Sequence, residues 1–70
     1  MDKERKEHIG KCFSRAFRIL EEHWNAKNRH EWKDMYADMY VMAGDDEFAI
    51  DLCTVLQNEI YRNMKGNVRV

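Results

Sequence analysis

Apolar side chains recur at steps of three and four residues through three separate stretches of the chain, and no proline interrupts them. Such steps place side chains on one face of an α-helix. The apolar positions of the three stretches are, in order, Ile9, Phe13, Ala16, Phe17, Leu20 and Trp24; Trp32, Met35, Tyr36, Met39, Tyr40 and Ala43; and Ala49, Leu52, Cys53, Leu56, Ile60 and Met64. The spacing therefore predicts three amphipathic helices, over about residues 3–26, 29–43 and 46–65.

Polar residues and glycines mark the ends of the second and third predicted helices. Asn28 is suited to cap the second helix, because its side-chain oxygen can accept from a free amide of the first turn. Gly44 is expected to end that helix, since glycine adopts a left-handed conformation without steric cost. Asp45 is expected to cap the third helix, and Gly66 to end it before a frayed tail of residues 67–70.

The three helices account for one domain, residues 1–70, and the predicted fold class is all-α, a small three-helix bundle. A domain of this size buries only about 60% of the surface that its unfolded chain exposes. Chains this short often supplement their core with disulfide bonds, a metal or oligomerisation. Cys12 and Cys53 are the only cysteines, too few for a disulfide scaffold.

The N-terminal segment, residues 1–7, is almost entirely charged and lacks the apolar run of a secretory signal. No stretch approaches the about 20 apolar residues that span a bilayer. We therefore expect no membrane association, a cytoplasmic location and two free thiols.

The third predicted helix carries more apolar surface than one inward face requires. Phe48, Leu52 and Val55 form a second ridge at positions i, i+4 and i+7, which points largely away from the first. The sequence predicts that this ridge binds a protein partner, as a homodimer built on the third helix. Met35 and Met42 are expected to contribute, and Met42, towards the polar side of its helix, is expected to be exposed. The alternative is that the first and second helices cover both sides of the third within one copy.

His8 and Cys12 have metal-ligating side chains and lie four positions apart, a spacing that suits two zinc ligands on one helix face. Cys53 is a possible third ligand. Structural zinc normally takes four ligands, often in closely spaced pairs, and a second pair is missing from the sequence. A nucleophilic cysteine needs an adjacent base, an orienting group and a pocket. We therefore expect no metal, no cofactor, no catalytic residue and no enzymatic activity.

The net charge is −1, which provides no general attraction to nucleic acid. A helix-turn-helix DNA reader is disfavoured, because a recognition helix presents basic or amide side chains from its first turns. The third predicted helix begins instead with three acidic residues, Asp45, Asp46 and Glu47. A nucleic-acid partner is accordingly not expected. Any such binding would use the basic face of the first helix, which consists of Lys3, Arg5, Lys6, Lys11, Arg15 and Arg18.

The sequence thus favours a small, non-enzymatic protein–protein interaction or regulatory domain that self-associates through the third helix. One alternative is a small nucleic-acid-binding regulator that uses the basic face of the first helix. The other is an acidic inhibitor or accessory factor, which would bind a larger protein through the residues around Asp45 and Asp46.

Overall fold

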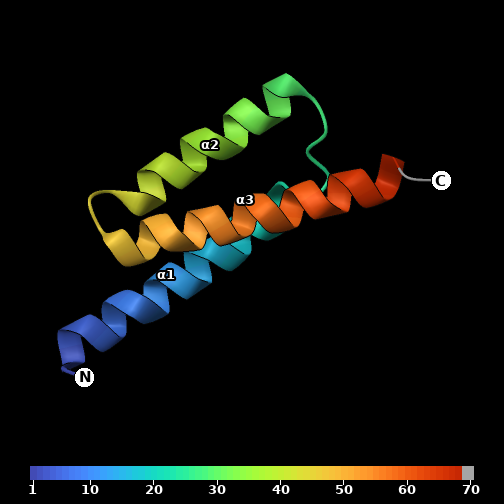
Figure 1. The fold of residues 1–70 in the computed structure, drawn as a ribbon. Helices are drawn as coiled ribbons and strands as arrows, with labels where there is room; N and C mark the ends of the chain where they lie inside the picture. Colours follow the sequence, from blue (N-terminus) through green and yellow to red (C-terminus); the bar gives the residue numbers. More distant parts are fainter. Residues whose placement is uncertain (69–70) are drawn as a thin grey trace.

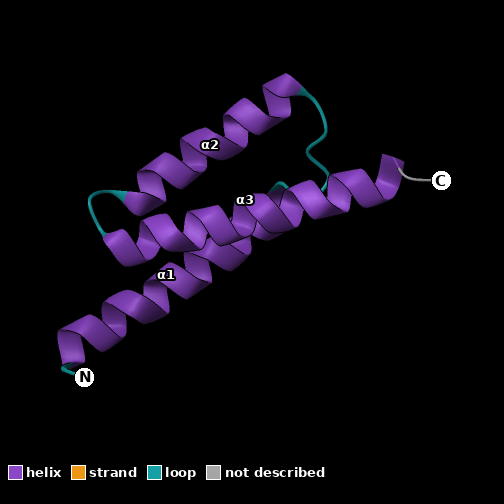
Figure 2. Ribbon diagram, in the orientation of Figure 1, coloured by secondary structure: helices purple, strands orange, loops and turns teal. Residues whose placement is uncertain are grey.

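Three α-helices joined by two short connections make up the fold (Figures 1 and 2). In this computed structural model, which describes residues 1–68 and their side chains up to residue 66, α1 spans Lys3–Glu22, α2 Arg29–Ala43 and α3 Glu47–Val68. Each helix packs against the other two, and α2 runs antiparallel to α1 and α3 (Figure 1). Among the described residues there is no strand, and no helix is long and apolar enough to cross a bilayer. The predicted all-α three-helix bundle is confirmed.

The first helix ends at Glu22, short of the predicted end near residue 26. The amide of His23 makes the last helical hydrogen bond, and the amide of Ala26 then donates to the His23 carbonyl over 3.0 Å. This turn carries Ala26 into the core, where its carbonyl accepts from the indole N–H of Trp32. The apolar period continues to Trp24 in the sequence, but the chain leaves the helix at His23 to make this turn.

For the connection between α2 and α3, the predicted end of α2 is confirmed and the predicted cap of α3 is wrong. Gly44 ends α2 with a φ of 52°, as expected of a residue without a β-carbon. The cap of α3 is Asp46 rather than Asp45, because its side-chain Oδ2 accepts from the amide of Ala49 over 2.9 Å. The chain uses one further residue, Asp45, to reverse direction before helical geometry begins. At the other end of α2, Asn28 caps the helix as predicted, with its Oδ1 2.8 Å from the amide three residues on.

The third helix continues through Gly66 to Val68, so the predicted end at Gly66 is wrong. Glycine in a helix costs only about 1 kcal/mol relative to alanine, which is not enough by itself to break the last turns. The remaining part of the expected tail, residues 69–70, lies outside the described residues.

The core consists mostly of small or flexible side chains. Its buried apolar members are Cys12, Ala16, Ile19, Ala26, Met35, Met39, Met42, Ala49, Leu56 and Ile60. Met42 exposes only 9% of its surface, so its predicted exposure is wrong. It belongs to the same buried cluster as Ile19 of α1, which shows that α1 covers the flank of α2 that the sequence assigned to solvent.

Candidate functional site

Five apolar side chains of α1 and α3 lie outside the buried core. Phe13 and Phe17 of α1, with Phe48, Leu52 and Val55 of α3, form this α1–α3 strip. Phe13, Phe17 and Val55 expose 56%, 60% and 58% of their surfaces, and the other two are half-buried. The rings of Phe13 and Phe48 meet edge to face, with centroids 5.6 Å apart. The apolar rows of the two helices therefore join across the seam.

The strip forms because each helix carries some apolar residues on its buried face and others on the neighbouring exposed side. On α1 the inward positions include the small side chains of Cys12 and Ala16, and a phenylalanine follows each of them. A shift of one residue turns a side chain by about 100° around the helix axis. On α3, Phe48 is likewise one residue away from the buried Ala49. The bulky rings are thus turned away from the core, and the neighbouring small side chains point into it.

The structure separates the five residues that were predicted to bind a partner. Val55 is exposed on the strip, with Phe48 and Leu52 half-buried beside it. Met35 and Met42 are core residues, exposing 0% and 9% of their surfaces. Their predicted contribution to the binding surface is therefore corrected, because neither is accessible on this chain.

Phe13 and Phe17 are the strip residues that sequence reasoning missed, since both were assigned to the inward face of the first helix. One signal for their exposure was present in the sequence. Cys12, Ile19 and His23 form a competing row at steps of seven and four residues on the neighbouring flank. That row supplies the inward face, and the two phenylalanines lie to one side of it.

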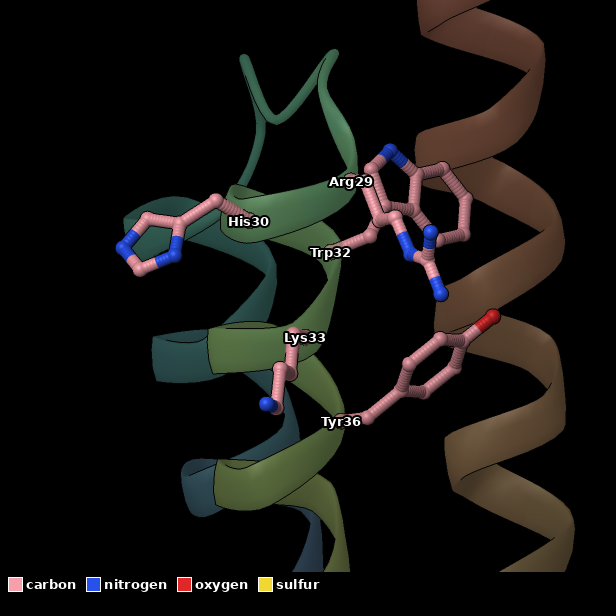
Figure 3. A pocket seen from close by; sticks show the side chains of 5 residues that line it. All are labelled: Arg29, His30, Trp32, Lys33 and Tyr36. Carbon is pink, nitrogen blue, oxygen red and sulfur yellow. The ribbon is translucent and has the colours of Figure 1, made fainter.

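A second aromatic surface lies between α2 and α3. The ring of Trp32 is 5.9 Å from that of Tyr36 and 6.3 Å from that of Tyr61, measured between centroids. Beside them is a shallow hollow of about 660 Å³, lined by Arg29, His30, Trp32, Lys33 and Tyr36. Figure 3 shows Trp32 and Tyr36 directed towards α3, whereas His30 points away from them. The polar groups of this hollow therefore do not converge on one ligand position.

A polar cluster joins the N-terminal half of α1 to the start of α3. The Nε2 atom of His8 lies 3.5 Å from Sγ of Cys12 and 3.3 Å from Oδ2 of Asp46. Arg5 holds the other carboxylate oxygen of Asp46 at 2.9 Å. The hydrogen bond from Arg5, followed by that from the amide of Ala49, lowers the pKa of Asp46 from 3.8 to about 2. Asp46 is therefore a carboxylate throughout the neutral range.

Cys53, the third zinc ligand considered from the sequence, lies outside this cluster. Its thiol contacts the carbonyl of Met39 over 3.5 Å, and burial raises the pKa of that thiol. The third possible ligand beside His8 and Cys12 is Asp46 instead. A second group of possible ligands, Glu22, His23 and Asp38, is held by a 2.7 Å contact between His23 Nε2 and Asp38 Oδ2.

Three of the six residues of the basic face predicted on the first helix gather on α1. Lys11, Arg15 and Arg18 line a small hollow of about 230 Å³ together with Ser14. None of these three cations forms an ion pair within the part of the chain that the structure describes. Arg5, in contrast, is engaged by Asp46.

Comparison of the chain with known protein families, with curated proteins and with solved structures finds no match in any of the three.

Proposed function

We propose that the chain is a non-enzymatic interaction domain that self-associates through the α1–α3 strip. The observation that carries this proposal is the exposure of Phe13, Phe17 and Val55, each by more than half, on two packed helices whose apolar rows meet at the contact between Phe13 and Phe48. Large contiguous apolar patches are uncommon on monomeric soluble proteins and mark interaction surfaces.

A second copy of the chain is the partner that the strip suits best. The core holds few large side chains, and Met35 and Ile60 are the large residues that are fully enclosed within the described chain. Short chains with so little core commonly gain stability by oligomerisation. The strip is apolar, so a second copy of it offers a surface of matching polarity, and a two-fold symmetric dimer uses the same patch on both copies.

The proposal is tested by sedimentation equilibrium of the wild type and of Val55→Glu over the micromolar range. The wild type is expected to form dimers, and Val55→Glu to remain monomeric, because dimerisation would bury an unpaired carboxylate. Val41→Glu is the matched control, since Val41 is 82% exposed on α2 and lies outside the strip. A wild type that is monomeric at every concentration, or a Val55→Glu variant that dimerises as the wild type does, would contradict the proposal.

Nucleic-acid binding by the basic face of α1 is a second candidate function. It is favoured by one observation: Lys11, Arg15 and Arg18 gather around a hollow and form no ion pair with the residues that the structure describes. Contacts of such residues with phosphates release counterions and weaken with salt. A gel shift at low salt should then show binding by the wild type and weaker binding by Arg15→Gln. Absence of a shift would eliminate this candidate.

The acidic-inhibitor alternative gains no support from the described contacts. Asp46, one of the two residues on which it depends, is occupied by Arg5 and by the first turn of α3.

A further inference from the structure

We propose that His8, Cys12 and Asp46 form a zinc-binding site that links α1 to the start of α3. The three residues supply one imidazole nitrogen, one sulfur and one carboxylate oxygen, and these ligand atoms all lie within 4.8 Å of one another. His8 and Cys12 occupy one face of α1 at positions i and i+4, and Asp46 comes from the cap of another helix.

The two distances from His8 Nε2 match edges of a zinc coordination tetrahedron. Zinc binds nitrogen and oxygen at about 2.0–2.2 Å and sulfur at about 2.3 Å, so a tetrahedral ion separates nitrogen from sulfur by about 3.5 Å and nitrogen from oxygen by about 3.3 Å. The corresponding distances from His8 Nε2 are 3.5 Å to Cys12 Sγ and 3.3 Å to Asp46 Oδ2. The two distances from His8 are thus those of a tetrahedral site, and Cys12 Sγ lies within 4.8 Å of an Asp46 carboxylate oxygen.

The geometry suits a metal better than a catalytic relay. In a nucleophile–histidine–carboxylate relay, the two partners of the imidazole contact its two different nitrogen atoms. Here Cys12 and Asp46 both approach the same nitrogen, Nε2 of His8. Convergence on one ring nitrogen is expected when all three side chains direct lone pairs to a common point.

The ligand set selects the kind of cation. Thiolate and imidazole favour zinc over magnesium or calcium, which prefer sets made entirely of oxygen ligands. On binding, the proton of the Cys12 thiol passes to solvent, the His8 ring binds in its neutral form, and Asp46 is already ionised. Arg5 remains on the other carboxylate oxygen, where it orients the ligand.

Three protein ligands leave the fourth position for water or for a group from another molecule, which is the arrangement of open zinc sites. The side chain of His8 is 45% exposed, so an ion can reach the cluster from solvent on that side. Cys12, in contrast, is buried and fixed on the inward face of α1.

The test is a titration of the reduced, metal-free chain with Co²⁺, which reports a bound thiolate by its near-ultraviolet charge-transfer absorption, followed by competition with Zn²⁺. The wild type should bind one Co²⁺ per chain and release it to Zn²⁺. Each of His8→Gln, Cys12→Ser and Asp46→Asn should weaken binding by more than about tenfold. Asp46→Asn keeps a capping side chain, so the start of α3 is preserved.

Two matched controls lie outside the cluster: Cys53→Ser removes the other thiol, and His30→Gln removes an exposed histidine. Both should bind Co²⁺ as the wild type does. Circular dichroism before each titration checks the fold, and His8→Gln decides the outcome if Cys12→Ser does not fold, because His8 is exposed. Absence of the charge-transfer absorption in the wild type, its persistence in His8→Gln, or its loss in Cys53→Ser would overturn the proposal.

Discussion

Replacing Phe17 with alanine is expected to weaken self-association of the chain by about 30- to 300-fold. Full burial of a large apolar side chain contributes about 1.5–3 kcal/mol, and 60% of the Phe17 surface remains exposed in the single chain. Covering that remainder contributes about 1–1.75 kcal/mol per copy. A symmetric dimer buries two copies, which together contribute about 2–3.5 kcal/mol, and each 1.4 kcal/mol changes the dissociation constant by a factor of about ten.

The variant should remain folded, because Phe17 lies outside the buried core and alanine has a higher helix propensity than phenylalanine. The assay is sedimentation equilibrium at several loading concentrations, from which the dissociation constant is fitted. Tyr40→Ala is the matched control, since Tyr40 is an aromatic residue 84% exposed on α2, outside the strip. Equal dissociation constants for Phe17→Ala and Tyr40→Ala would refute the assignment of the interface.

Three further predictions concern stability. The folded-state pKa of Asp46 is about 2, below its ordinary 3.8, so the stabilisation that its charge provides is present above pH 3.8 and is lost as the pH falls from there towards 2. Urea unfolding across this range should show less acid sensitivity in Asp46→Asn than in the wild type, and equal sensitivity would exclude this cause. Gly10→Ala should raise the melting temperature, because Gly10 lies inside α1 with open space around its would-be β-carbon. Gly44→Ala should lower the melting temperature, because the φ of Gly44 is 52° and alanine is strained there. Calorimetry in which both glycine variants shift the melting temperature in the same direction would contradict this reasoning.

The number and order of the helices could be predicted from the sequence because they depend on local periodicity. Their ends depended on geometry between neighbouring elements. Asp45 and Asp46 are equally good caps by residue type, and only the path of the chain after Gly44 selects Asp46. The apolar period of the first stretch continues to Trp24, but the turn that buries Ala26 ends α1 before it.

The candidate sites were harder to predict because both join residues that are distant in the sequence. The ridge of Phe48, Leu52 and Val55 was visible on one helix, but its continuation onto Phe13 depends on the register of α1 against α3. The same register brings Asp46 to His8, whereas the sequence alone marks Asp46 only as one of three consecutive acidic residues. Spacing within one helix determines which residues share a face, but not which face of another helix lies opposite.

Both proposals concern the same pair of helices, yet they act at different positions along the seam. A cation bound by His8, Cys12 and Asp46 would fix the N-terminal half of α1 against the first turn of α3, next to the contact between Phe13 and Phe48. A dimer would cover the strip on the outside of that seam. Val55→Glu disrupts the strip two turns beyond Phe48 and leaves all three metal ligands in place, whereas His8→Gln removes a ligand and leaves the strip intact. Cobalt binding by Val55→Glu and dimerisation by His8→Gln therefore show whether each property exists without the other.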